Sequence, residues 1–172
     1  YLTTILEILK QCADTILKNI NNPELIDYAK VLVIGPTESG KTALIHLLAG
    51  DELISSKKKF GGYELNCLKT TLIEYAIRGN YIETLPKVYI DHKNKNIFIE
   101  FPDFLDNLNN IQKIINAFII HSVFKSVGKM KLLLALPDSA IFACRGAIAK
   151  EFLLAIESAI PDKEKLFSGI AL

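Results

Sequence analysis

The chain has 172 residues, which is enough for one domain with a substantial core and too few for two domains of ordinary size. Half of the residues are hydrophobic, and this excludes an intrinsically disordered chain. The formal net charge of +1 gives no electrostatic reason to expect a nucleic acid or a membrane surface as a partner.

The three cysteines, Cys12, Cys67 and Cys144, lie far apart and show no Cys-x-x-Cys spacing. This arrangement predicts free thiols in a reducing compartment, neither a disulfide framework nor a metal site, and we expect a cytoplasmic protein. No uninterrupted apolar run reaches about 18 residues, so we expect no transmembrane segment. The chain begins on Tyr1 and ends on the strand-like stretch "SGIAL", and we therefore expect it to be a piece of a longer protein.

The first fifty residues predict two helices, a strand and a third helix. Amphipathic spacing runs through residues 2–20, and the Asn-Pro pair at 22–23 favours the start of a second, short helix. The stretch "KVLVIG" at 30–35 is a β-branched apolar run bounded by glycine, which is typical of a strand buried on both faces. Residues 41–50, "KTALIHLLAG", predict a helix that ends at its glycine.

The remainder of the chain alternates between strand-like and helix-like patterns after an unclear stretch. Residues 51–85 give no clear pattern, although the part around 70–77 favours a strand or a helix. The stretch "KVYIDHKNKNIFIEF" at 87–101 predicts a hairpin of two alternating strands. A helix, an apolar strand, another helix and the start of another strand are then expected over 105–127, 129–136, 143–160 and 165–172. This order predicts an α/β fold, with a mostly parallel sheet, helices on both faces and one antiparallel hairpin strand.

One short motif predicts a phosphate-binding site. "GPTESGKT", residues 35–42, fits G-x-x-x-x-G-K-[ST] and lies directly after the buried strand and directly before a helix, as this motif requires. The glycines allow a tight loop, and the helix start adds a positive dipole end. Lys41 is the cation for the terminal phosphates, and the Thr42 hydroxyl is a ligand for Mg²⁺. The predicted binding residues are Gly35, Pro36, Thr37, Glu38, Ser39, Gly40, Lys41, Thr42 and Ala43.

A second motif carries a family resemblance. With "NIFIEFPDF" at 96–104, the chain resembles the P-loop GTPases, particularly the septin-like and immunity-associated branch whose second motif reads Asp-Thr-Pro-Gly-Phe. The resemblance covers about residues 30–172 and implies a three-layer P-loop fold, binding of GTP or GDP with Mg²⁺, and slow hydrolysis. It also allows nucleotide-dependent dimerisation. We expect residues 1–29 to be a helical lead-in and 30–172 a nucleotide-binding domain that is incomplete at its C-terminus.

The resemblance assigns roles to three further positions. Glu100 stands where the family has an aspartate and is expected to bind Mg²⁺. Asp103 stands where the family has a glycine whose N–H meets the γ-phosphate. A carboxylate about 4 Å from that phosphate is repelled by about 4 kcal/mol per unit charge at an effective dielectric of 20, so sensing of the γ-phosphate is expected to be degraded. Thr84 is the expected switch-one threonine, a Mg²⁺ ligand that acts with Lys41 in catalysis, and Thr70 and Thr71 are the alternatives.

Other interpretations of the sequence stay open. The guanine-reading motif would follow the strand that begins near residue 166, so guanine specificity rests on the resemblance alone. The chain could instead be a pseudo-GTPase interaction module without hydrolysis, or an ATP-binding P-loop protein. His46, in the helix that follows the phosphate loop, is expected to be a polar residue of the helix surface rather than a catalytic one.

Overall fold

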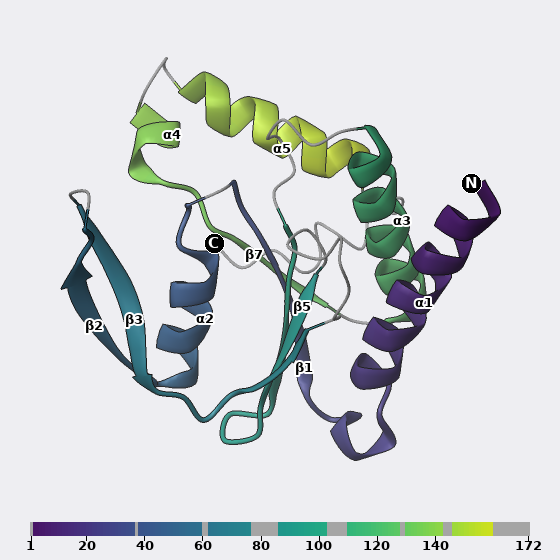
Figure 1. The fold of residues 1–172 in the computed structure, drawn as a ribbon, viewed down its shortest axis with the longest axis horizontal. Helices are drawn as coiled ribbons and strands as arrows, with labels where there is room; N and C mark the ends of the chain where they lie inside the picture. The colour runs from purple at the N-terminus through teal and green to yellow at the C-terminus, as the bar shows by residue number, and fades with distance from the viewer. Residues whose placement is uncertain are drawn as a thin grey trace.

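A computed structural model describes residues 2–36, 38–59, 62–76, 86–102, 110–127, 130–142 and 146–159. Its centre is a five-stranded mixed sheet with the strand order β4-β5-β6-β1-β7 (Figure 1). These strands are β1 (Ala29–Ile34), β4 (Ile73–Ala76), β5 (Lys87–Asp91), β6 (Asn96–Glu100) and β7 (Lys131–Leu134).

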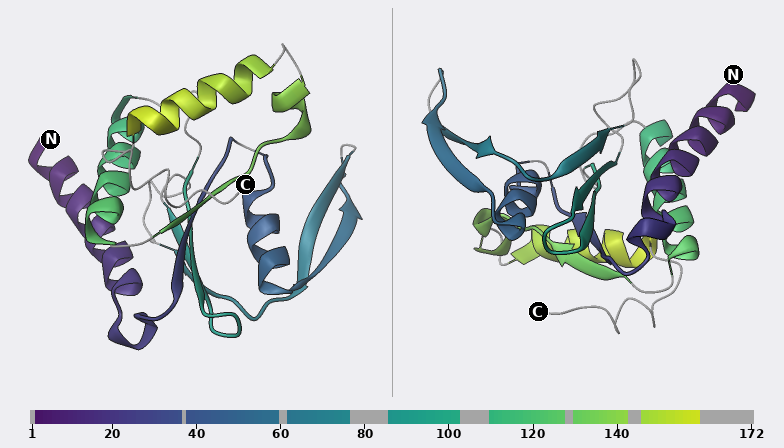
Figure 2. Two further views of the ribbon diagram at one scale, coloured as in Figure 1. Left: turned by 180° about the vertical axis from the view of Figure 1, so that it is seen from behind. Right: turned by 90° about the horizontal axis from the view of Figure 1, so that it is seen from below.

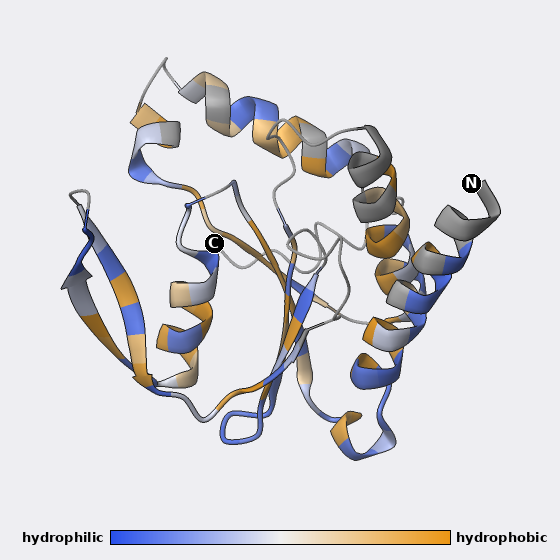
Figure 3. Ribbon diagram, viewed as in Figure 1, coloured by the Kyte–Doolittle hydropathy of each residue, from blue (hydrophilic) through white to orange (hydrophobic). Residues whose placement is uncertain are grey.

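The α/β class expected from the sequence is confirmed, and the sheet is parallel only in part. Strand β1 pairs in parallel with β6 on one side and β7 on the other. Strand β5 pairs antiparallel with both β4 and β6, and its link to β6 is the predicted hairpin. The hairpin turn is hydrophilic while the neighbouring central strands are mostly hydrophobic, which is the contrast that made it recognisable (Figure 3).

Helices pack on both faces of the sheet, as predicted. On one face lie α1 (Leu2–Ile20), α3 (Asn110–Ser126) and α5 (Ala147–Ala159), and on the other lies α2 (Lys41–Ala49) (Figures 1 and 2). Strand β1 serves both layers because alternate side chains of a strand point to opposite faces. Leu32 and Ile34 join the larger core with α1, α3 and α5, whereas Val31 and Val33 pack with Ile45 of α2.

The helices predicted over 2–20, 41–50, 105–127 and 143–160 are confirmed wherever these stretches fall within the described residues. The short helix predicted at the Asn-Pro pair is confirmed as the 3₁₀ helix η1 (Pro23–Leu25). The Asn22 side chain caps its start by accepting a hydrogen bond from the Glu24 N–H at 3.1 Å. The short helix α4 (Asp138–Phe142) was not expected, and the strand expected at 165–172 lies outside the described residues. Among the described helices, none is both long and apolar enough to cross a membrane.

A separate two-stranded sheet occupies the stretch that gave no clear sequence pattern. It is the antiparallel hairpin of β2 (Glu52–Lys57) and β3 (Tyr63–Lys69), which lies beside α2 and outside the main sheet (Figure 1). Most residues of both strands are exposed. A strand that buries neither face carries no regular alternation of apolar and polar residues, and this explains why the sequence did not predict it.

Candidate functional site

The loop from residue 35 to residue 40 joins the end of β1 to the first turn of α2. Two of its residues have left-handed backbone, with φ of 58° at Glu38 and 82° at Gly40. Glycine adopts this region freely, whereas for a residue such as glutamate it costs about 1–2 kcal/mol. The Ser39 N–H donates to the Pro36 carbonyl oxygen at 3.2 Å, so the loop is a tight turn held by its own backbone.

Gly35 is needed because the chain passes very close to the end of β7. A side-chain Cβ at this position would collide with the carbonyl oxygen of Ala135 and with Ser39 Oγ. The same region is fixed by the Ala135 N–H, which donates to the Ile34 carbonyl oxygen at 2.8 Å. The first glycine of the motif therefore sets how closely the loop approaches the sheet.

Lys41 begins α2 and is buried, with only 8% of its surface exposed. Its ammonium group turns back over the loop and donates hydrogen bonds to the carbonyl oxygens of Gly35 at 2.8 Å and Pro36 at 2.9 Å. A positive charge is thus held at the start of a helix, where the backbone N–H groups already favour an anion.

Two hydroxyl groups of the loop region have different surroundings. Ser39 Oγ is buried and has no hydrogen-bond partner among the described residues. Thr42 Oγ1 is in exposed surroundings and donates a 2.7 Å hydrogen bond to Glu100 Oε1. A buried hydroxyl without a partner costs free energy, so a ligand atom that accepts a hydrogen bond from Ser39 would be stabilising.

Glu100 links Thr42 to the interior of the sheet. It ends β6 and lies opposite Val33 of β1 in the parallel register, so its side chain emerges at the same sheet edge as the loop. The Tyr89 hydroxyl of β5 donates to the second carboxylate oxygen of Glu100 at 3.0 Å. Burial, and next the negative charge of Glu100, raise the pKa of the Tyr89 phenol far above its usual range, so this residue remains a proton donor.

Lys41, Thr42 and Glu100 line a cavity of about 530 Å³ between the loop and the β2–β3 hairpin, whereas Tyr89 supports Glu100 without lining it. The lining residues that the sequence predicted are Glu38, Ser39, Gly40, Lys41, Thr42, Ala43 and Glu100. The opposite wall comes from the hairpin and consists of Lys58, Tyr63, Glu64 and Leu65. The sequence did not predict this wall, because residues 51–85 give no clear pattern of secondary structure. Tyr89, which orients Glu100 from outside the cavity, was missed as well, and its only signal is a hydroxyl-bearing residue between two apolar residues of a strand.

The remaining predicted site residues are placed differently or not described. Thr37, Thr84 and Asp103 lie outside the described residues. Thr70 and Thr71, the alternatives to Thr84, both donate hydrogen bonds to Asp51, which lies at the opposite end of α2 from the loop. A helix of nine residues is about 13 Å long, so neither of these two hydroxyls belongs to the loop site.

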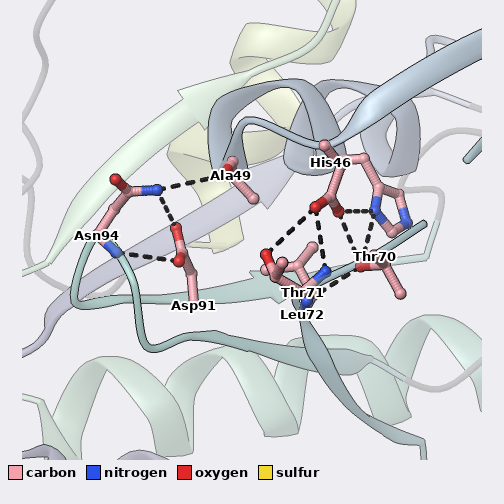
Figure 4. Close-up of polar contacts among 8 residues, drawn as sticks. His46, Ala49, Thr70, Thr71, Leu72, Asp91 and Asn94 are labelled. Carbon is pink, nitrogen blue, oxygen red and sulfur yellow. Dashed lines mark hydrogen bonds and ion pairs between the residues drawn. The ribbon is translucent and has the colours of Figure 1, made fainter. Parts of the chain in front are cut away.

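Asp51 is the centre of a second polar cluster. Its carboxylate accepts hydrogen bonds from the His46 ring at 2.8 Å, from Thr70 Oγ1 at 2.8 Å, and from both the N–H and the hydroxyl of Thr71 (Figure 4). Burial alone would raise the pKa of Asp51, but these hydrogen bonds outweigh it and lower the pKa to about 2. The cluster fixes the segment that leaves α2 against the link between β3 and β4.

The loop site combines a buried cation, a helix start, a hydroxyl group and a carboxylate around one cavity. Such a set is suited to an anionic ligand together with a hard divalent cation, because phosphates prefer cations and backbone N–H groups while Mg²⁺ prefers oxygen ligands. Comparisons of the chain with protein-family models, curated proteins and solved structures found no match. The function must therefore be inferred from the site itself.

Proposed function

We propose that this chain is a P-loop domain that binds a guanine nucleotide with Mg²⁺ and hydrolyses GTP slowly, as a switch or assembly module. The observation that carries the proposal is the 2.7 Å hydrogen bond from Thr42 to Glu100. It joins the residue after Lys41 to the end of the neighbouring parallel strand, at the wall of a cavity of about 530 Å³.

The arrangement of strand, loop and helix supports phosphate binding. The loop follows β1, the middle strand of the parallel part of the sheet, and ligands of open α/β sheets bind beyond the carboxyl ends of such strands. In this proposal Lys41 neutralises the terminal phosphates, while the loop backbone and the Ser39 hydroxyl donate hydrogen bonds to phosphate oxygens. The positive end of α2 adds to the attraction.

The Thr42–Glu100 pair fits a Mg²⁺ ion. Thr42 donates its proton to Glu100, and this direction leaves the oxygen lone pairs of Thr42 available for a cation. The Tyr89 hydroxyl donates a hydrogen bond to the other carboxylate oxygen of Glu100, and this bond orients the carboxylate before an ion binds. Mg²⁺ bound there would neutralise charge on the phosphates.

Slow hydrolysis is proposed because the described cavity wall contains neither glutamine nor histidine to orient a water molecule. Catalysis would then rest on charge neutralisation by Lys41 and on positioning by the loop. Thr84 stays the proposed switch-one threonine. A pseudo-GTPase module is the second candidate, and Asp103 favours it, since a carboxylate in the second motif opposes the γ-phosphate.

The test is nucleotide binding by Lys41→Ala, compared with a matched lysine variant. Lys30 is half-buried and also caps backbone carbonyls, those of Leu25 and Ile26, but it lies at the other end of β1. Fluorescent GTP, GDP and ATP analogues are titrated into each folded protein with Mg²⁺. We expect Lys41→Ala to abolish binding of GTP and GDP and Lys30→Ala to preserve it. Equal binding by wild type and Lys41→Ala would refute the phosphate-loop assignment, and a preference for ATP would refute guanine specificity.

A further inference from the structure

Three potential metal ligands meet at the end of α2 that is far from the phosphate loop. His46 lies in the last turn of α2, Asp51 in the link to β2, and Cys67 in β3. One ligand atom from each, an imidazole nitrogen, a carboxylate oxygen and the thiol sulfur, lies within 4.8 Å of the other two. This group could not be predicted from the sequence, because the spacings of 5 and 16 residues match no common metal motif.

The fold orients each of these side chains toward the others. In β3, Cys67 is the one residue that is half-buried while the others are exposed, and its sulfur lies close to His46 and Asp51. In the antiparallel register it lies opposite Leu53, two residues after Asp51. The His46 ring is fixed by an edge-to-face contact with Tyr89 at a centroid distance of 6.2 Å.

The Asp51 carboxylate is held in place by Thr70 and Thr71, which would not themselves bind the ion. One oxygen accepts from the Thr71 N–H and hydroxyl at 3.1 and 3.2 Å. The other oxygen, which faces His46 at 2.8 Å, is also bound by the Thr70 hydroxyl at 2.8 Å (Figure 4). Hydrogen bonds of this kind orient carboxylate ligands in metal sites.

We propose that His46, Asp51 and Cys67 form a binding site for a borderline divalent cation such as Zn²⁺, with three protein ligands and a fourth position open to solvent. A thiolate and an imidazole favour Zn²⁺ over Mg²⁺ or Ca²⁺, which require oxygen ligands. The Asp51 side chain is 1% exposed, whereas the His46 side chain is 16% exposed and Cys67 is half-buried, so the open position lies on the side of His46 and Cys67. On binding, Cys67 releases its proton to solvent, and the neutral His46 ring changes tautomer, so that its single ring proton moves by way of solvent from Nδ1 to Nε2 and the Nδ1 lone pair binds the cation.

Such an ion would fasten the β2–β3 hairpin to α2. The same hairpin supplies Tyr63, Glu64 and Leu65 to the wall of the cavity at the phosphate loop. The ion would therefore fix the position of that wall. The site does not depend on the proposed nucleotide function, because none of its three ligands lines the cavity.

The first test needs no variant. The reduced, metal-free protein without nucleotide is alkylated with and without one equivalent of Zn²⁺, and the modification of each cysteine is followed by mass spectrometry. We expect Zn²⁺ to slow alkylation of Cys67 at least tenfold and to leave Cys12 and Cys144 unchanged. Unchanged alkylation of Cys67 would overturn the proposal, and nucleotide binding would remain to be judged separately.

The second test uses Co²⁺ as a spectroscopic probe. Titration should produce a thiolate-to-cobalt charge-transfer band that saturates at one equivalent of Co²⁺ and disappears when Zn²⁺ displaces the Co²⁺. Cys67→Ser should abolish the band, His46→Gln should weaken Co²⁺ binding about a hundredfold, and Thr70→Val about tenfold, the scale found for groups that orient ligands. The matched controls Cys12→Ser and His121→Gln, an exposed histidine on α3, should bind as wild type. A band that persists in Cys67→Ser, or that never forms in wild type, would refute the site.

Discussion

The Thr42 hydroxyl donates a 2.7 Å hydrogen bond to Glu100 Oε1, although the two residues are 58 positions apart in the sequence. The contact joins the first turn of α2 to the end of β6, and two neighbouring strands bring these elements together. Thr42 follows the loop after β1, Glu100 ends β6, and the two strands are parallel neighbours with Val33 opposite Glu100. Their carboxyl ends therefore meet at one edge of the sheet, where a hydroxyl and a carboxylate face the same cavity.

Thr42 is expected to contribute to nucleotide binding only through Mg²⁺. Thr42→Ala removes the hydroxyl and should weaken Mg²⁺-dependent binding about tenfold, the scale of one lost hydrogen bond or ligand contact. Thr42→Ser retains the hydroxyl and should bind nearly as wild type. Binding of a fluorescent GDP analogue in Mg²⁺ and in EDTA provides the measurement. An equal loss under both conditions would exclude Thr42 from the metal shell.

Glu100 should matter for the metal because of its charge. Glu100→Gln keeps the shape and an acceptor for Thr42 but removes the negative charge, so we expect Mg²⁺-dependent affinity to fall between tenfold and a hundredfold. Affinity measured in EDTA should change little. Glu64→Gln is the matched control, since Glu64 lines the same cavity from the hairpin and hydrogen-bonds to Ser56. If both variants lose Mg²⁺-dependent affinity equally, the loss reflects the total charge of the cavity, and Glu100 is not a specific Mg²⁺ ligand.

Glu38 should be a source of strain in the free protein. Its φ of 58° is unfavourable for a residue with a side chain, so Glu38→Gly should raise the free energy of unfolding by up to about 1 kcal/mol, even after the greater flexibility of glycine in the unfolded chain is included. Glu38→Ala removes the same carboxylate without relieving the backbone and should give no such gain. Urea denaturation of the two variants provides the comparison. An identical change in both would mean that charge, not backbone, decides the outcome.

Asp51 should make the free energy of unfolding fall at acidic pH. Its pKa is lowered from 3.8 to about 2 in the folded protein, so the folded state favours the ionised form. The resulting stability, about 2 kcal/mol, is present above pH 4 and is lost as the pH falls toward 2. Asp51→Asn should therefore be less stable at pH 7 and show a shallower loss between pH 4 and pH 2.

This prediction is measured by denaturant unfolding in EDTA, so that no metal contributes. Asp14→Asn, which removes an exposed carboxylate on α1, is the control and should follow the wild-type pH profile. Parallel pH profiles of Asp51→Asn and wild type would show that the hydrogen bonds around Asp51 do not stabilise the folded state.

The sequence by itself determined the elements in which burial imposes a regular pattern of apolar side chains. The apolar run of β1 and the amphipathic pattern of α1 could each be recognised because burial imposes a periodicity on the residues. The glycine that follows β1 and the glycine that precedes α2 identified the loop, since a close approach at Gly35 and a left-handed backbone at Gly40 both favour the absence of a side chain.

The tertiary structure decided which distant residues meet. No local pattern reveals that Tyr89 orients Glu100, that the β2–β3 hairpin forms the second wall of the cavity, or that Cys67 lies beside His46. These contacts depend on strand order and register, and strand order is set by how the two apolar faces of the whole sheet are covered by helices. Periodicity reports that a residue is buried, but it carries no information about which partner buries it.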